Sequence, residues 1–124
     1  MKALTVRQPY ANFIAEGVKT VEVRSRKTNH RGPLLIHAGA TIAPEWREEC
    51  LAADVDLGCL YVVADVIDCR PFLPADCEAA MMADDDFKPG LFAWVLANPR
   101  EIGLIDYKGQ QGMFNVPDDL IKYF

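Results

Sequence analysis

The sequence predicts an α+β fold, in which about six or seven short strands form a small mixed β-barrel with two or three short helices at its ends. Its 124 residues are enough for one domain with a buried core, and 51% hydrophobic and 25% charged residues are typical of a globular protein. The strand-like stretches do not alternate regularly with helices, which disfavours a doubly wound parallel sheet. We therefore expect residues 1–124 to form a single domain.

The first part of the chain predicts the order strand, helix, strand. Met1–Arg7 alternates apolar and polar residues, which indicates a first strand. A short helix is expected over Tyr10–Glu16, with Pro9 at its first position and Gly17 as the residue that ends it. The β-branched, alternating stretch 17–24 then predicts the second strand.

Three charged side chains lie close together in stretch 17–24. Glu22 and Arg24 are two residues apart, so they share one face of the strand with Thr20. Lys19 has the opposite parity and reaches that face only if residues 17–19 form a turn and the strand begins after them. Buried charges are costly unless they pair or line a pocket. Two interpretations therefore stay open, a pocket or an exposed strand with self-neutralising charges.

The middle of the chain predicts a basic loop, a buried strand and a second helix. Residues 25–32 (SRKTNHRG) form a polar loop without periodicity, in which His30 is a candidate for contacting a ligand. The apolar run 34–38 indicates a buried strand, and we interpret His37 within it as a core residue. Helical spacing and a proline at its start predict a helix over Pro44–Ala53, with Trp46 in a packing role.

The second half predicts further strands separated by loops. Cys59–Cys69 is expected as a long strand, with Asp65 as an edge-strand acid that discourages mispairing. Stretch 70–90 predicts a loop with at most a short helix near 75–82, and its Asp84–Asp86 run is interpreted as solvated. The remaining expected elements are strands 91–97 and 101–107 with a break at Asn98-Pro99, a turn at 108–112, a strand at 113–116 and helical turns within 117–123.

The net charge of −5 is distributed unevenly along the chain. Residues 1–32 carry seven bases and two acids, which gives +5, whereas the rest of the chain carries six bases and sixteen acids, which gives −10. A basic sector on an acidic body suggests a directed anionic partner. The alternative is that the basic loop pairs with acidic loops of the same molecule.

The four cysteines, at positions 50, 59, 69 and 77, include no CxxC pair and have no partnered histidines. We therefore expect free thiols, no metal site, no cofactor and a cytoplasmic location. The chain contains no apolar run of about 18 residues, so no contact with a membrane is expected. Its N-terminus lacks the apolar segment of a signal peptide. We also expect the protein to be a monomer.

An ordered series of motifs resembles the ASCH domain, named after the activating-signal-cointegrator homology region. The resemblance covers nearly the whole chain, which is also similar to a small stand-alone eukaryotic member of that superfamily. The matching stretches are Arg7-Gln8-Pro9-Tyr10, the GxKxxExR motif of residues 17–24, RGPLLIH at 31–37, residues 58–69, FAWVLANP at 92–99 and KGQQG at 108–112.

The resemblance implies a PUA-like β-barrel, a fold associated with RNA and modified-nucleoside binding, with the motif lining a cleft between the barrel and the first helix. RNA or a nucleoside or nucleotide is therefore the expected partner. Phosphates would contact basic side chains, and Glu22 would hold Arg24 straight. Tyr10 or Trp94 is a candidate for stacking on a base, although a core role is favoured for both. The candidate ligand-binding residues are Arg7, Gln8, Lys19, Glu22, Arg24, Arg26, His30 and Arg31, with Lys27 as a further phosphate contact.

The resemblance also implies hydrolases as an alternative. One branch cleaves the acetyl amide of N4-acetylcytidine with a lysine, a threonine and a glutamate; Lys19 matches that lysine, but Glu22 stands where the branch has threonine. Another member has been described as a metal-dependent ribonuclease. In an enzyme, the candidate catalytic residues are Lys19, deprotonated by burial and opposed by Glu22, or Glu22 acting on water. A protein-interaction module is the third alternative.

Overall fold

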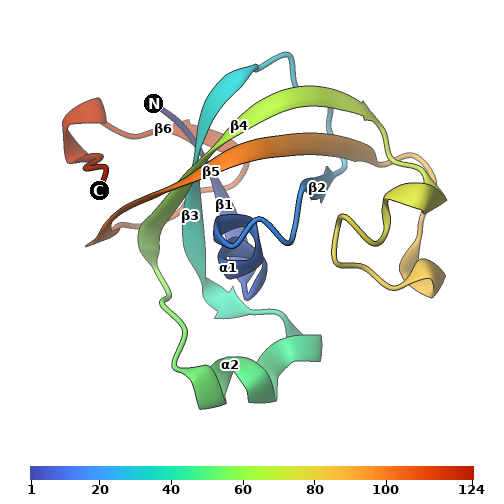
Figure 1. Cartoon of the computed structure of the whole chain (residues 1–124), viewed down its shortest axis with the longest axis horizontal. Helices are drawn as coiled ribbons and strands as arrows, with labels where there is room; N and C mark the ends of the chain where they lie inside the picture. Colours follow the sequence, from blue (N-terminus) through green and yellow to red (C-terminus); the bar gives the residue numbers. More distant parts are fainter.

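The structure, a computed structural model, describes residues 1–124 as one curved sheet with short helices around it. The six strands are hydrogen-bonded in the order β2-β5-β4-β3-β1-β6. In Figure 1, β4 and β5 run as long curved strands across the molecule, with α1 in the concavity. The strands are β1 (Lys2–Gln8), β2 (Val21–Arg24), β3 (Gly32–Ile42), β4 (Cys59–Pro71), β5 (Phe92–Asp106) and β6 (Met113–Asn115).

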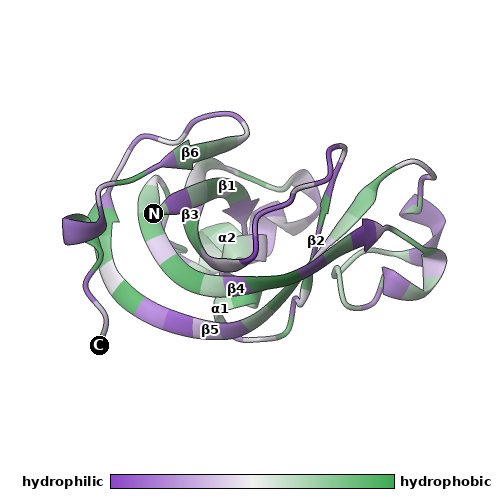
Figure 2. Cartoon of the chain, turned by 90° about the horizontal axis from the view of Figure 1, so that it is seen from above, coloured by the Kyte–Doolittle hydropathy of each residue, from purple (hydrophilic) through white to green (hydrophobic).

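The sheet is mixed and barrel-like but does not close. Strands β1 and β3 are parallel, and the other neighbours are antiparallel. Seen from above, β3, β4 and β5 curl around the centre of the molecule (Figure 2), whereas β2 and β6 occupy the two edges. The predicted α+β fold is confirmed, and the six strands fall within the expected number.

Two α-helices and four short 3₁₀-helices complete the chain. Helix α1 spans Tyr10–Ala15 and α2 spans Arg47–Ala53, as expected, except that the first turn of the second helix is a separate 3₁₀-helix. No helix has both the length and the apolar composition that a membrane crossing requires. The 3₁₀-helices are η1 (Pro44–Trp46), η2 (Pro74–Asp76), η3 (Asp84–Asp86) and η4 (Asp118–Leu120).

Strand β5 runs without interruption through the Asn98-Pro99 dipeptide, so the predicted break there was wrong. The register with β4 shifts at this point, because Arg100 pairs with Val63 and Ala97 pairs with Asp65. Asn98 has a φ of 54°. This bulge absorbs the proline, which has no N–H to give to the ladder, and the strand continues beyond it.

The interpretation of Asp65 as an edge-strand acid was also wrong, because β4 lies between β3 and β5. Its carboxylate accepts hydrogen bonds from Arg100 (2.9 Å) and Asn98 (3.2 Å) on the neighbouring strand. The bond from Arg100 is the main reason that the pKa of Asp65 is lowered. Asp65 therefore stabilises the bulge in β5 and does not act against mispairing of an edge strand.

His37 is a core residue, as predicted. Only 1% of it is exposed, and its Nε2 lies 2.5 Å from the carbonyl oxygen of Tyr107. Its Nδ1 lies 3.2 Å from the hydroxyl of Thr5. Both ring nitrogens therefore have partners within the fold, and they fasten the chain after β5 onto β1 and β3.

The segment between β4 and β5, residues 72–90, forms a separate lobe at one end of the molecule (yellow in Figure 1). Its buried residues Phe72, Cys77 and Ala80 pack against Val21 of β2 and Ala93 of β5. The backbone N–H groups of residues 20 and 21 also donate to one carbonyl in this segment. These contacts fix the lobe against the beginning of β2.

Candidate functional site

Gly17 ends α1 and directs the chain towards the candidate site. With φ at 78°, its N–H donates to the carbonyl of Ile14 (3.1 Å), and the N–H of Val18 donates to that of Phe13 (2.9 Å). This pair of bonds is a Schellman motif, which the predicted stop signal anticipated. Because β2 begins only at Val21, Lys19 lies in the turn before the strand, as the parity argument required.

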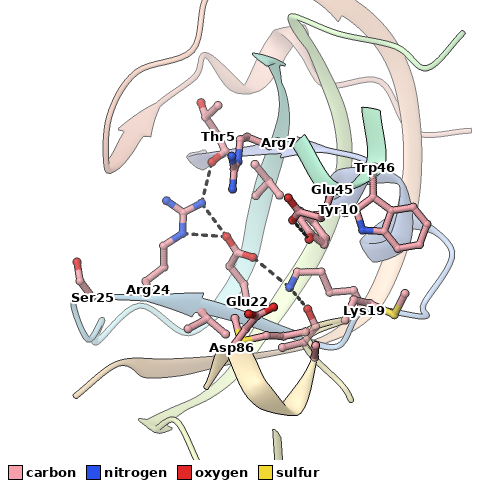
Figure 3. A pocket seen from close by; sticks show the side chains of 16 residues that line it. Thr5, Arg7, Tyr10, Lys19, Glu22, Arg24, Ser25, Glu45, Trp46 and Asp86 are labelled. Atoms are coloured by element: carbon pink, nitrogen blue, oxygen red, sulfur yellow. Dashed lines mark hydrogen bonds and ion pairs between the residues drawn. The ribbon is translucent and has the colours of Figure 1, made fainter. Parts of the chain in front are cut away.

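Lys19, Glu22 and Arg24 form a continuous cation–anion–cation row (Figure 3). The Nζ of Lys19 lies 3.5 Å from Oε1 of Glu22, and Nη2 of Arg24 lies 2.7 Å from Oε2. Arg24 Nη2 also donates to the carbonyl of Thr5 (2.8 Å). Thr20 was expected on the same face, but it precedes the strand and is exposed. Thus β2 supplies the row's anion and one of its cations.

Lys19 is unusually enclosed for a lysine, with only 5% of the residue exposed. Its ammonium group donates to the carbonyl of Ala80 (2.7 Å) and lies 5.2 Å from the centre of the Tyr10 ring. Burial lowers the pKa of Lys19, and the charge of nearby Arg24 adds to this effect, whereas the carboxylate of Glu22 opposes it. Lys19 is therefore a buried base with a perturbed pKa, which is characteristic of functional sites.

The row faces a cavity of about 730 Å³, within the range of small-molecule sites. Three bases and three acids line it, so the cavity has no excess of positive charge. Half-buried Trp46 and Met82 add apolar surface. The full lining comprises Thr5, Val6, Arg7, Tyr10, Lys19, Glu22, Val23, Arg24, Ser25, Glu45, Trp46, Ala80, Met81, Met82, Ala83 and Asp86.

A hydrogen bond from the hydroxyl of Tyr10 to Glu45 joins α1 to η1 at the rim of the cavity. Burial and this bond raise the pKa of Tyr10 to about 12. The same bond lowers the pKa of Glu45. Tyr10 is therefore neutral at physiological pH, and its ring remains in place beside Lys19.

An ion pair between Arg70, near the end of β4, and Asp76 of the 72–90 lobe stabilises the opposite wall of the cavity. The two carboxylate oxygens of Asp76 accept hydrogen bonds from Arg70 at 2.7 and 2.8 Å, and one also accepts the N–H of Leu73 (2.9 Å). The bonds from Arg70 are the main cause of the lowered pKa of Asp76. The turns that follow Asp76 include Ala80, whose carbonyl holds Lys19.

The cavity brings together only part of the predicted ligand-binding set. Arg7 lines it with the three residues of the row, and Arg26 lies in an adjoining hollow. Gln8 is fully buried and donates to the carbonyl of Asp56 (2.9 Å). It also accepts the N–H of the first turn of α1. Gln8 therefore has a structural position outside the cavity.

Two further candidates, His30 and Arg31, also lie outside this cavity. The Nε2 of His30 lies 2.8 Å from the carbonyl of Pro33. Arg31 donates to the carbonyls of Thr28 (3.1 Å) and His30 (2.9 Å). Both side chains thus shape the 25–31 loop, and a role in binding stays a prediction for them.

Sequence reasoning missed Ala80, Glu45, Met81 and Met82 as parts of the site. The sequence indicated Glu45 as an acid in the first turn of the predicted helix, where a negative charge is favourable. No local pattern indicated its hydrogen bond with Tyr10. The acceptor at Ala80 is a main-chain oxygen, and no side-chain pattern marks it. Met81 has a φ of 58°, a strained conformation for a non-glycine residue at the cavity wall.

Metal-ligating side chains do not converge in this protein, since no group of three or more His, Cys, Asp or Glu residues is arranged to hold an ion. The Asp84–Asp86 run forms the exposed helix η3. Of its three residues, only Asp86 lines the cavity.

The curved, barrel-like mixed sheet with short helices around it is a PUA-like fold. A family model described as "ASCH domain" matches residues 4–106, and the chain therefore belongs to the ASCH domain family, as its ordered motifs predicted. Activating signal cointegrator 1 of Homo sapiens is 31% identical over 113 residues. The protein of the same name from Mus musculus is 30% identical over 116 residues. Both alignments cover 80% of this chain and 19% of the relative, so the chain spans about a fifth of these curated relatives.

Solved structures agree with the fold. An ASCH protein from Zymomonas mobilis superimposes with a TM-score of 0.69 at 13% identity, over 95% of this chain and 88% of that chain. A serine-to-alanine mutant of the same protein gives a TM-score of 0.69 at 13% identity, over 98% of this chain and 96% of that one. At this identity the likeness concerns the fold alone.

Proposed function

We propose that this protein binds RNA, or a nucleoside or nucleotide with a natural or modified base, in the cavity around Lys19. The observation that carries the proposal is the enclosed row of Lys19, Glu22 and Arg24 at the wall of a cavity of about 730 Å³. Enclosing such charges is costly, and a purely structural role would be served as well by apolar side chains. A polar ligand that completes their hydrogen bonds accounts for their presence.

Unused hydrogen-bond donors of Arg24 support this proposal. The guanidinium has five N–H groups. Its Nε and Nη2 are directed at Glu22 and Thr5, whereas Nη1 has no acceptor within the protein. Glu22 therefore orients Arg24 so that Nη1 remains free for the carbonyl edge of a base or for a phosphate oxygen.

The apolar surface of the cavity suits the face of a base. Tyr10 and Trp46 line it, whereas Trp94 is 5% exposed and donates its ring N–H to the carbonyl of Arg26 (2.9 Å). Trp94 thus has the core role that was favoured for it. Bases stack on aromatic side chains with little dependence on sequence, so Trp46 is the better candidate for this contact.

The same proposal places the protein in the cytoplasm as a monomer. All four cysteines are free thiols, which supports a reducing compartment. The name of the mammalian relatives, activating signal cointegrator, keeps a protein partner as an alternative. A partner protein would be sought only if no nucleic-acid component bound.

Titration of the purified protein with the four ribonucleosides, their 5′-monophosphates, N4-acetylcytidine and short single-stranded RNAs tests the proposal. Calorimetry and fluorescence anisotropy at low salt should detect at least one of these ligands. Lys19→Met should weaken its binding about tenfold or more, because a charge-assisted hydrogen bond contributes roughly 1.5–3 kcal/mol. The matched control is Arg47→Ala, an exposed base outside the cavity. Folded protein that binds none of these ligands would refute the proposal.

A second candidate function, amide hydrolysis on a modified nucleoside, is favoured by the lowered pKa of Lys19. A neutral Lys19 could take a proton from water as the water oxygen adds to the acyl carbon. That proton would pass to the leaving amine when the carbon–nitrogen bond breaks, giving a carboxylic acid and the free base. Glu22 is a poorer base, because its two carboxylate oxygens face Lys19 and Arg24.

Chromatography after incubation with N4-acetylcytidine, and with RNA in the presence and absence of magnesium, separates the two candidates. Release of acetate and cytidine that disappears in Lys19→Met and survives in Arg47→Ala would establish the enzyme. Binding without any turnover would leave the protein as a binding module.

A further inference from the structure

A second hollow, of about 470 Å³, adjoins the cavity around Lys19. Arg24 and Ser25 line both, so the two spaces meet at the end of β2. The residues that line the second hollow come from β1, β5, the end of β2 with the loop after it, and the turn that leads into β6. Its lining comprises Leu4, Arg24, Ser25, Arg26, Lys27, Thr28, Trp94, Gln111, Gly112 and Met113.

The two spaces differ in charge. Three bases and three acids line the cavity around Lys19, whereas the second hollow has the bases Arg24, Arg26 and Lys27 and no acid. Arg26 and Lys27 are exposed and take part in no ion pair. Their charges are therefore not neutralised within the protein, and the basic loop does not pair with acidic loops through them.

The backbone that presents these two bases is fixed at several points. The ring N–H of Trp94 donates to the carbonyl of Arg26 (2.9 Å), and the N–H of Thr28 lies 3.4 Å from the sulfur of Cys69. Arg31 adds a bond to the carbonyl of Thr28 (3.1 Å). A loop held in this way loses less freedom when a ligand binds, which favours affinity.

We propose that the second hollow is a phosphate subsite, and that the ligand spans both spaces. The base and sugar would occupy the charge-balanced cavity, and the attached phosphate would lie between Arg26 and Lys27. Arg24 would be positioned at the junction. This inference rests on the proposed function and narrows its ligand from a free nucleoside to a nucleotide, either a monophosphate or one unit of single-stranded RNA.

The charges explain why the phosphate belongs to the second hollow. Attraction to a phosphate comes from unneutralised lysine and arginine side chains and weakens as salt is added. Glu22, Glu45 and Asp86 oppose such attraction in the first cavity. The nucleoside part should consequently bind with little dependence on salt, and the phosphate should add a salt-dependent gain.

Affinities of nucleosides, their 5′- and 3′-monophosphates and a fluorescein-labelled eight-nucleotide RNA test this assignment. At 20 mM salt the preferred monophosphate should bind at least tenfold more tightly than its nucleoside. Arg26→Ala combined with Lys27→Ala should abolish this gain without changing nucleoside affinity. For the RNA, the slope of log affinity against log salt should become shallower by about 0.7 for each phosphate that the variant no longer neutralises. The matched control is Arg47→Ala combined with Lys122→Ala, which removes two exposed bases outside both spaces.

The outcomes distinguish this inference from the proposed function. Equal affinity for the nucleoside and for every phosphorylated probe, the RNA included, would overturn the phosphate subsite and leave nucleoside binding intact. Unchanged binding of phosphorylated ligands by the Arg26/Lys27 double variant would overturn it as well. Failure of the wild-type protein to bind any probe would overturn both. An increase in affinity over the nucleoside that only the RNA shows would assign the subsite to a polynucleotide. An increase that the monophosphates also show would assign it to a single phosphate group.

Discussion

Arg24 directs two of its nitrogens at a single carboxylate oxygen of Glu22. Its Nε lies 2.9 Å and its Nη2 lies 2.7 Å from Oε2. The other oxygen, Oε1, is thereby left to face Lys19 at 3.5 Å. The carboxylate of Glu22 thus pairs with Arg24 through one oxygen and with Lys19 through the other. Loss of this carboxylate should disturb both ion pairs.

The variant Glu22→Gln should lower the free energy of unfolding at pH 7 by about 3 kcal/mol, because removing one partner of a buried ion pair leaves the other charge uncompensated. The folded-state pKa of Lys19 is already below 10.5, so the unfolded state binds more protons between the two values and stability rises with pH in that window. The carboxylate of Glu22 raises the pKa of Lys19, so its removal lowers this pKa further and widens the pH range over which stability rises. The deficit should therefore shrink as the pH approaches about 10.

Urea denaturation at pH 7 and pH 9.5 measures this effect. Glu101→Gln, on an exposed glutamate without an ion pair, provides the control and should change little. A deficit that is absent at pH 7, or that grows at pH 9.5, would contradict the account of the row.

Burial, together with the hydrogen bond to Glu45, should make Tyr10 titrate close to pH 12. Because the pKa of Tyr10 is raised from 10 to about 12, its stabilisation is complete below pH 10 and is lost as the pH rises through about 12. Burial also raises the pKa of Tyr61, so the late part of an ultraviolet titration of tyrosinate should contain more than one tyrosine, and Tyr10→Phe should reduce its amplitude near pH 12 by one tyrosine. A control variant, Tyr123→Phe, changes an exposed tyrosine and should leave the amplitude near pH 12 unchanged. Unaltered titration in Tyr10→Phe would rule out the assignment.

Asp76→Asn should loosen the lobe that anchors Lys19. Hydrogen bonds to a charged group contribute roughly 1.5–3 kcal/mol, and Asp76 makes such bonds with Arg70 and with the N–H of Leu73, so we expect a loss of about 2 kcal/mol. Because the pKa of Asp76 is lowered in the folded protein, the wild-type stabilisation is present above about pH 3.8 and is lost as the pH falls through the lowered value.

Hydrogen exchange over residues 72–90 should accelerate in Asp76→Asn and remain normal in Asp85→Asn, which changes an exposed carboxylate of the same lobe. Equal exchange in both variants would show that the Arg70 pair does not hold the lobe.

Gly109→Ala should destabilise the protein by about 1–3 kcal/mol through overpacking. A Cβ at this position would lie 2.6 Å from the hydroxyl of Thr5 and 2.8 Å from Cε1 of His37. At Gly103, the nearest atom to an added Cβ is 3.8 Å away, so Gly103→Ala should stay within about 0.5 kcal/mol. Thermal unfolding of the two variants gives the comparison, and equal stability would contradict the close approach at Gly109.

Local patterns predicted most of the strands and both α-helices, because alternation and stop signals act over a few residues. The predicted end of α1 at Gly17 and the parity argument for Lys19 both depended on such short-range rules. The fold class was likewise accessible, since it follows from the order of elements.

The errors arose where distant strands decide the outcome. Proline is a local breaker, but whether β5 ends at Pro99 depends on the register that β4 imposes. The role of Asp65 depends equally on which strands flank β4. The carbonyl that holds Lys19 lies 61 residues away and has no side-chain signature. The cavity's far wall was consequently beyond the reach of sequence reasoning.

The two outermost strands of the sheet are also its shortest, Val21–Arg24 and Met113–Asn115. Each border strand therefore offers at most three or four residues of backbone as a template for another molecule, and on β2 the N–H of Val21 already donates to the carbonyl of Ala79. Longer exposed borders promote edge-to-edge aggregation. Concentrated solutions of this protein should accordingly stay clear, which suits the high protein concentrations that calorimetry and nuclear magnetic resonance require.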